Sequence, residues 1–122
     1  MLFAGETKPR LILVADDFED VADTVAEVIH HATGIDTAVA HDGDEALSIL
    51  LRERPQLALL DLDMPHQTGI QVAESSRSAG LPTFMIAMTG GVLADAARQS
   101  GAFDLVLMKP LDVPGLLDSL GL

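Results

Sequence analysis

The sequence predicts one α/β domain, in which a parallel five-stranded sheet lies between two layers of helices. Short apolar runs, typical of strands buried on both faces, alternate five times with segments of helical periodicity. Strict alternation favours a parallel sheet because each crossover helix packs back onto one face. With 122 residues, 48% of them hydrophobic, the chain is long enough for one core and too short for two domains.

The first half of the chain predicts two strand and helix pairs. The apolar run 11–15 is the first strand, and valines at helical spacing predict a helix over 19–33. A short β-rich run at 35–40 is the second strand. The capping-box pattern Asp42–Glu45 opens a second helix, which Pro55 ends.

The second half repeats the alternation, with glycine or proline at most boundaries. The remaining elements are expected at 57–60 (strand), 70–79 (helix), 82–88 (strand), 92–100 (helix), 103–108 (strand) and from Asp112 onward (helix). Residues 1–9 are predicted to form an N-terminal arm, and residues 10–122 the domain.

The charge balance limits the possible partners. Nineteen acidic and seven basic residues give a net charge of -12, so nucleic-acid backbones and anionic membranes should repel the chain directly. No apolar run has the length of a membrane span and no secretory pattern begins the chain, so we expect a cytoplasmic location. The absence of cysteine excludes disulfides and thiolate metal sites.

Polar residues follow the apolar runs at the points where the predicted strands end. Asp16 and Asp17 follow the first run, Asp61 the third, Thr89 the fourth and Lys109 the fifth. Because parallel strands present their carboxyl ends to one edge of a sheet, we expect these residues to meet. Three carboxylates there repel by about 4 kcal/mol per close pair at an effective dielectric near 20, so a divalent metal or the Lys109 ammonium must balance them.

These residue types suit phosphoryl transfer. Magnesium prefers oxygen ligands, so Asp17 and Asp61 are candidate direct ligands and Asp16 a candidate to hold a metal-bound water. A carboxylate such as Asp61 can attack a phosphoryl group and form an aspartyl-phosphate. Lys109 would neutralise one phosphoryl oxygen, and the Thr89 hydroxyl would donate a hydrogen bond to another.

At this point the chain resembles the response-regulator receiver domain of two-component signalling, the family typified by the chemotaxis regulator. The resemblance covers about residues 10–120. It rests on the acidic pair Asp16-Asp17, on Asp61 followed by Met64-Pro65 and Gly69, on Thr89, and on Lys109-Pro110. The stretch GAFDLVLMKPLDVPGLL is most similar to receivers of hybrid histidine kinases, and the sequence leaves open whether the chain is free-standing or part of such a kinase.

The resemblance implies a flavodoxin-like fold with strand order 2-1-3-4-5. It also implies magnesium-dependent transfer of a phosphoryl group to Asp61 from a histidine kinase or a histidine phosphotransfer domain. The backbone carbonyl of Asp63 would be a further magnesium ligand. Such a chain is a phosphoacceptor that assists its own phosphorylation and dephosphorylation, not an enzyme, and it signals to a downstream protein or relays the group through a changed surface.

Two positions depart from the family pattern. Val106 stands where the family usually has an aromatic ring that follows the switch hydroxyl, and we expect Leu105, Val106 and Leu107 to be core residues. Asp63 adds a carboxylate beside the site. Gly91, two residues beyond Thr89, is expected to leave the path of attacking water open, which predicts a short-lived phosphoryl group.

The four histidines are expected to have surface or capping roles. His30 and His31 end the first predicted helix, where a cation suits the helix dipole. His41 is predicted at the surface. His66, in the loop after Asp61, is an alternative metal ligand that magnesium disfavours.

Two alternative functions remain open from the sequence. Asp61-Leu62-Asp63 resembles the D-x-D pair of haloacid-dehalogenase-like phosphatases, although the acidic pair of those enzymes comes late in the chain rather than first. A pseudo-receiver that binds partners without phosphorylation is the other alternative, and Val106 is the only residue in its favour.

Overall fold

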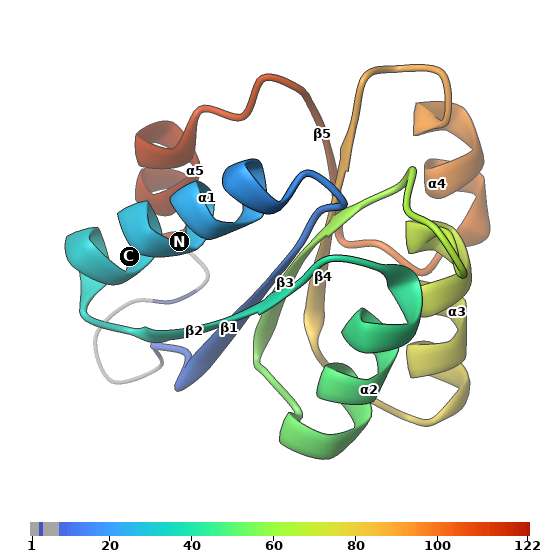
Figure 1. The fold of residues 1–122 in the computed structure, drawn as a ribbon, viewed down its shortest axis with the longest axis horizontal. Helices are drawn as coiled ribbons and strands as arrows, with labels where there is room; N and C mark the ends of the chain where they lie inside the picture. Colours follow the sequence, from blue (N-terminus) through green and yellow to red (C-terminus); the bar gives the residue numbers. More distant parts are fainter. Residues whose placement is uncertain (1–2, 4–7) are drawn as a thin grey trace.

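The computed structural model describes residue 3 and residues 8–122. Five strands and five helices alternate along the chain (Figure 1). The strands are β1 (Leu11–Ala15), β2 (Asp36–Ala40), β3 (Leu57–Asp61), β4 (Phe84–Thr89) and β5 (Leu105–Met108). The helices are α1 (Glu19–Thr33), α2 (Gly43–Glu53), α3 (Gly69–Ser78), α4 (Ala94–Ser100) and α5 (Val113–Leu120).

All neighbouring strands pair in parallel, and the sheet order is β2-β1-β3-β4-β5. Helices α1 and α5 cover one face of the sheet, and α2, α3 and α4 cover the other (Figure 1). The predicted three-layer, flavodoxin-like fold is therefore confirmed. The chain order reverses direction across the sheet between β1 and β3, and binding sites in such sheets lie at the carboxyl ends of the strands around this switch point.

Apolar clusters lie on both faces of the sheet. Successive strand residues point to opposite faces, so Ile12 and Val14 join the core under α1 and α5, whereas Leu13 and Ala15 join the core under α2 and α3. All five residues of β3 are buried, as expected for a strand with neighbours on both sides and helices on both faces. The two edge strands, β2 and β5, differ from β3 in being only partly buried.

Several boundaries differ from the sequence prediction. Thr89 lies inside β4, and α4 begins at Ala94 rather than at residue 92 because the preceding residues form a turn. The expectation that Leu105 is a core residue is wrong, since Leu105 is 37% exposed on the edge strand. Val106 and Leu107 are partly buried and pack against different clusters.

The helix caps follow the sequence with one change. The Asp42 side chain accepts a hydrogen bond from the Glu45 N–H at 2.8 Å, as predicted, but the Glu45 side chain accepts from His41 N rather than from Asp42 N. A complete capping box instead opens α3, where Thr68 and Gln71 each accept a hydrogen bond from the other's backbone N–H.

The end of the sheet remote from the predicted site contacts Phe3. The Phe3 N–H donates to the carbonyl of Leu120 at 2.7 Å, and its ring meets Phe84 edge-on with centroids 6.4 Å apart. Residues 1–2 and 4–7 of the predicted arm lie outside the described residues, so the division at residue 9 stays a prediction.

Candidate functional site

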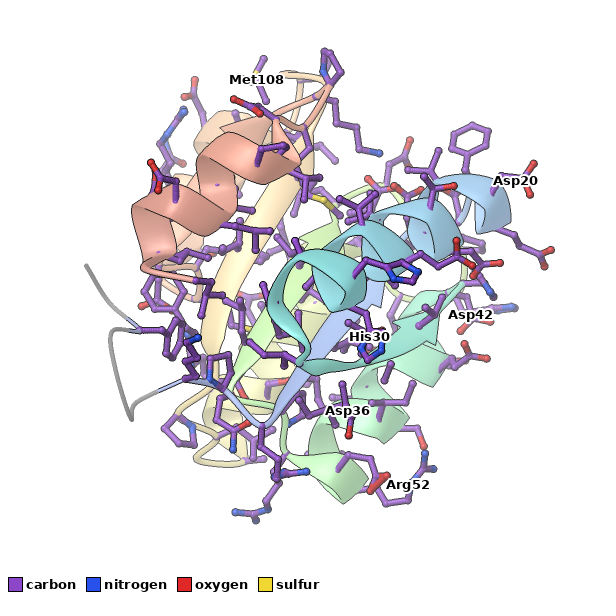
Figure 2. All side chains as sticks on the ribbon, turned by 90° about the vertical axis from the view of Figure 1, so that its left-hand side faces the viewer. Asp20, His30, Asp36, Asp42, Arg52 and Met108 are labelled. Carbon is purple, nitrogen blue, oxygen red and sulfur yellow. The ribbon has the colours of Figure 1, made fainter. Side chains whose placement is uncertain are left out.

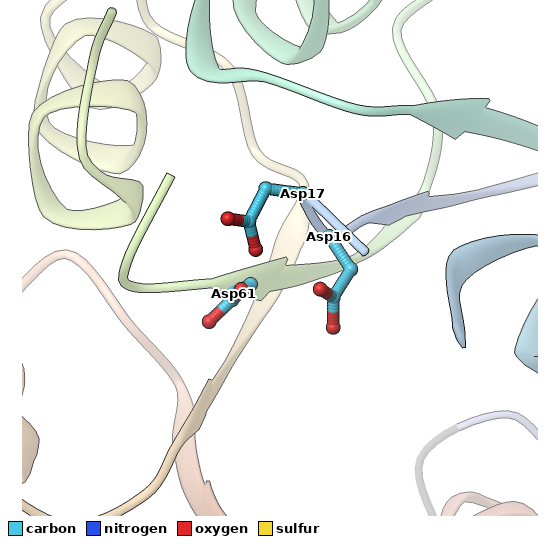
Figure 3. Close-up of side chains that lie close together, drawn as sticks. All are labelled: Asp16, Asp17 and Asp61. Atoms are coloured by element: carbon cyan, nitrogen blue, oxygen red, sulfur yellow. The ribbon is translucent and has the colours of Figure 1, made fainter. Parts of the chain in front are cut away.

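Three carboxylates meet at the carboxyl edge of the sheet (Figure 3). Asp16 and Asp17 directly follow β1, and Asp61 is the last residue of β3. Each offers an oxygen within 4.8 Å of the other two. The sheet positions them, because Asp16 N–H still donates to the carbonyl of Ala40, and Leu62 N–H to that of Met88. Acids 45 residues apart in the sequence therefore share one site.

Lys109, the residue directly after β5, completes the site. Its Nζ lies 3.1 Å from Asp16 Oδ2 and 3.3 Å from Asp61 Oδ1. Its backbone N–H donates to the carbonyl of Thr89 at 2.8 Å, which extends the ladder between β4 and β5 by one residue. The lysine is thus fixed at both its backbone and its ammonium, between two buried acids.

The electrostatics of the site are unbalanced. Asp16 is fully buried and Asp61 is 4% exposed. Burial, together with the charge of Asp16, raises the pKa of Asp61 to about 6, although the Asp63 N–H and Lys109 act in the opposite direction. Burial tends to lower the pKa of Lys109, but its hydrogen bond to Asp16 and the charges of both acids outweigh burial and raise it. One ammonium does not neutralise three carboxylates.

This donor set fits a hard divalent cation. The cluster consists of carboxylate oxygens alone, which is the chemistry that magnesium prefers. When all three acids are ionised, their three negative charges and the positive charge of Lys109 leave a net charge of minus two, which one Mg²⁺ would balance. Asp17, the exposed member, leaves the site open to solvent.

Thr89 lies beside the site, with its hydroxyl engaged locally. The residue is 5% exposed, and its Oγ1 accepts a hydrogen bond from the N–H of Gly91 at 3.1 Å. The hydroxyl proton remains available for donation. Asp63 is exposed, and its N–H donates to Asp61 Oδ1 at 3.3 Å. The assignment of its carbonyl as a magnesium ligand stays a prediction.

The segment between β3 and α3 packs so closely against the first residues of α2 and α3 that only glycine fits at both positions. A Cβ on Gly69 would lie 2.5 Å from the carbonyl oxygen of Asp61, and one on Gly43 would overlap Gln67. Gly43 N–H donates to the carbonyl of Pro65, and Gln67 Nε2 donates to Asp44 Oδ1 at 2.8 Å. Helix α2 therefore helps to hold the loop that follows Asp61.

Sequence reasoning did not find Gly43 or Gln67 among the residues that support the site. The signal for Gly43 is a glycine directly after a helix cap, where a side chain gives better helix propensity. The pairing of Gln67 with Asp44 carries no sequence signal, because it depends on how the loop after β3 packs against the first turn of α2.

The histidines lie away from the acid cluster. The His30 Nδ1 lies 2.8 Å from the carbonyl of Ile35, and His41 Nε2 lies 3.7 Å from Asp23 Oδ1. His66 is exposed with a φ of 70°, and the described residues that form the three-acid cluster do not include it. Within the part of the chain that the structure describes, no helix is both long and apolar enough to cross a membrane.

A doubly wound parallel sheet with three acids and a lysine at its carboxyl edge defines a class of signalling domain that takes a phosphoryl group on an aspartate. The model of the response regulator receiver domain matches residues 12–120. The chain belongs to this family, and the resemblance seen in the sequence is confirmed.

Sequence relatives agree with this assignment. The DNA-binding response regulator MtrA of Mycolicibacterium smegmatis is 40% identical over 107 residues, which cover 86% of this chain and 46% of MtrA. A response regulator receiver protein of Anaeromyxobacter is 33% identical over 112 residues, covering 89% of this chain and 46% of the relative. The chain therefore spans less than half the length of these relatives.

Solved structures give the same result. The receiver domain of the Francisella response regulator 1452 aligns with a TM-score of 0.80 and 28% identity, covering 91% of this chain and 93% of that one. The response regulator TrrA of Thermotoga maritima, solved in complex with Mg²⁺-BeF, aligns with a TM-score of 0.80 and 25% identity, covering 91% and 96%.

Proposed function

We propose that Asp61 is the phosphoacceptor of this receiver domain and that Mg²⁺ is required for its phosphorylation. The observation that carries the proposal is that Asp61 shares one site with Asp16, Asp17 and Lys109. In this proposal Asp16, Asp17, Asp61 and the carbonyl of Asp63 hold the metal. Lys109 and Thr89 bind the phosphoryl oxygens.

The contacts of Asp61 indicate which of its oxygens reacts. Both Lys109 Nζ and Asp63 N–H approach Oδ1, so Oδ2 has no protein partner among the described residues. Oδ2 forms a bond to phosphorus while the phosphorus–nitrogen bond of a phosphohistidine breaks, and the electron pair returns to the imidazole. When bound, Mg²⁺ supplies positive charge that draws the phosphoryl oxygens toward the acids.

Thr89 and Lys109 act on the oxygens of the transferred group. Lys109 lies 3.3 Å from the acceptor carboxylate, so its ammonium can follow the charge onto a phosphoryl oxygen. The Thr89 hydroxyl donates a hydrogen bond to another oxygen while still accepting one from the Gly91 N–H. Neither residue takes or gives up a proton, which agrees with a phosphoacceptor rather than a turnover enzyme.

An apolar cavity of about 510 Å³ opens beside the site, and we assign it to the docking phosphodonor. Asp16 and Lys109 stand at its polar end. Its apolar lining consists of Phe18, Val21, Val25, Met88, Pro110 and Leu111. Phe18 is 68% exposed directly after the acidic pair, so a histidine kinase or phosphotransfer domain that covers it reaches Asp61.

We also propose that the protein acts in the cytoplasm, as expected from its sequence.

Labelling with acetyl phosphate tests the acceptor assignment. With Mg²⁺ present, the wild-type chain should gain at most one phosphoryl group, and Asp61→Asn and magnesium-free wild type should gain none. Sustained hydrolysis of a generic phosphatase substrate that disappears in Asp63→Asn would instead support the phosphatase. No labelling of the folded wild type would support the pseudo-receiver.

A second experiment separates docking from chemistry. Phe18→Ala should slow transfer from a phosphotransfer protein that labels the wild type, by about tenfold for the loss of a large interfacial aromatic. Labelling by acetyl phosphate, which needs no docking, should not change. An exposed apolar residue elsewhere, changed in Leu51→Ala, is the matched control. Equal transfer rates for Phe18→Ala and wild type would contradict the docking assignment.

A further inference from the structure

Met108 occupies the space that a side chain on residue 91 would fill. Gly91 has a φ of +118°, and a Cβ built on it would lie 2.8 Å from Met108 Cε and 3.9 Å from Sδ. Met108 ends β5 and stands opposite Thr89 in the parallel register. The end of the methionine side chain therefore packs on the turn that follows Thr89.

This turn is bonded directly to the residues assigned to the phosphoryl group. Gly91 N–H donates to Thr89 Oγ1 at 3.1 Å, and the residue after Met108 is Lys109, whose ammonium contacts Asp61 at 3.3 Å. Figure 2 places Met108 at the end of the molecule opposite to Arg52, which lies in the last turn of α2. Met108 thus belongs to the carboxyl edge of the sheet.

The packing of Met108 is not that of a core residue. It is 52% exposed and belongs to none of the three buried clusters among the described residues. Its three rotatable bonds let it follow a mobile neighbour at low cost. Removing most of the side chain should therefore change the cover of the site more than the stability of the fold.

We infer that Met108 determines the lifetime of the phosphoryl group on Asp61 by shielding it from water on the side of Thr89. In hydrolysis, the oxygen of a water molecule bonds to phosphorus while the bond from phosphorus to the Asp61 oxygen breaks. The electron pair returns to the carboxylate, and the water proton leaves with inorganic phosphate. An apolar group over the Gly91 turn hinders the approach of that water.

The inference rests on the proposed function and revises one expectation from the sequence. The missing side chain at Gly91 predicts an open path for water and a short-lived phosphoryl group. Because the Met108 methyl fills this space from the neighbouring strand, residue 91 alone does not set the lifetime.

Loss of label from purified chains tests this role. The wild type, Met108→Ala, Met108→Leu and Leu105→Ala are labelled with acetyl phosphate and Mg²⁺, the donor is removed, and the labelled fraction is followed by intact mass spectrometry. Leu105→Ala is the matched control, because it truncates another exposed apolar residue of β5 that no contact joins to Gly91. Thermal unfolding checks that each variant is folded.

Met108→Ala should lose its label about fivefold faster than the wild type, because the apolar cover on the Thr89 side of the site is removed. Met108→Leu and Leu105→Ala should stay within about twofold of the wild type, and all four should gain label at similar rates. Equal loss from Met108→Ala and the wild type would overturn the inference and leave the proposed function intact. Failure to label the wild type would overturn both.

A second measurement needs no metal or phosphate. In protein labelled with [¹³C-methyl]methionine, the Met108 methyl should show a nuclear Overhauser effect to the α protons of Gly91. The methyl group of Met85, which is buried in the core under α2 and α3, should show no such effect. The absence of the effect at Met108 would overturn the packing on which the inference depends.

Discussion

The two ends of the sheet balance their charged side chains in opposite ways. At the amino ends of β4 and β5, Arg77 Nη2 lies 3.0 Å from Asp104 Oδ2, which also accepts from the N–H of Met85. Nη1 donates to the carbonyls of Leu81 and Thr83, and Nε donates to the carbonyl of Ala102. At the carboxyl ends, three acids share one ammonium.

The difference separates a structural cluster from a functional one. Around Arg77, one cation meets one acid and three carbonyls, so the charges balance and every guanidinium nitrogen has an acceptor. Around Asp61, negative charge exceeds positive charge, and burial with the Asp16 charge raises the pKa of Asp61 to about 6. In the proposed function, this excess of negative charge is relieved when a divalent cation binds.

The largest change in stability is expected at the amino ends of β4 and β5, where Arg77 is paired. Arg77→Met should lower the free energy of unfolding by about 3 kcal/mol, because the carbonyls of three buried residues lose a charged donor. Urea denaturation measures the loss, and Arg98→Met, at an exposed ion pair, is the control. If the two variants were equally stable, the Arg77 cluster would not be the structural counterpart of the site.

At the acid cluster, removing a charge is expected to raise the free energy of unfolding rather than lower it. Without metal, Asp61→Asn should stabilise the protein on the order of 2 kcal/mol above pH 6, because it removes a buried charge next to Asp16. The folded-state pKa of Asp61 lies above the unfolded value of 3.8, so its charge costs stability as pH rises from about 4 through about 6.

Urea denaturation of the wild type and Asp61→Asn from pH 4 to pH 8 measures this dependence. The difference between them should vanish near pH 4 and reach its maximum above pH 6. Asp104→Asn, which alters the acid paired with Arg77, should instead destabilise the protein at neutral pH. A destabilised Asp61→Asn at pH 8 would contradict the comparison.

Magnesium should relieve the imbalance at one end only. A concentration ten times the dissociation constant should raise the free energy of unfolding by about 1.4 kcal/mol. The gain should grow as pH rises through about 6, since the metal binds the ionised form of Asp61. Arg77→Met should keep this gain and Asp17→Asn should lose most of it. Calorimetry of both variants with Mg²⁺ and with Ca²⁺ provides the check.

The smallest effect is expected in the loop that follows Asp61. Gln67→Met removes the hydrogen bond to Asp44 and should cost less than about 1 kcal/mol, because the bond is exposed. Asp44→Asn, which keeps an acceptor oxygen for Gln67, should cost less than Gln67→Met. Thermal unfolding of the two variants measures the difference, and a cost equal to that of Arg77→Met would be unexpected.

The sequence predicted the functional end of the sheet better than the structural end. Apolar runs ending in Asp16, Asp61, Thr89 and Lys109 are local signals, and parallel topology brings them together without knowledge of side-chain packing. The cluster of Arg77 gave no such signal, because an arginine near the end of a helix is also expected at the surface.

Contacts between residues of different segments could not be predicted from the sequence. The cover of Gly91 by Met108 depends on the register of β5 against β4, and the burial of Leu105 was predicted wrongly because an edge strand has a neighbour on one side only. Helix α4 begins at Ala94, two residues later than the sequence predicts, because Val92 lies in a turn that exposes its side chain.

The central claim is that the unbalanced acid cluster exists to place a phosphoryl group on Asp61. Borohydride reduces an aspartyl-phosphate to homoserine, so labelling with acetyl phosphate and Mg²⁺, reduction and peptide sequencing locate the acceptor. The account predicts homoserine at position 61 alone, and none when Mg²⁺ is removed. Homoserine at position 16, 17 or 63 in the folded wild type would contradict it.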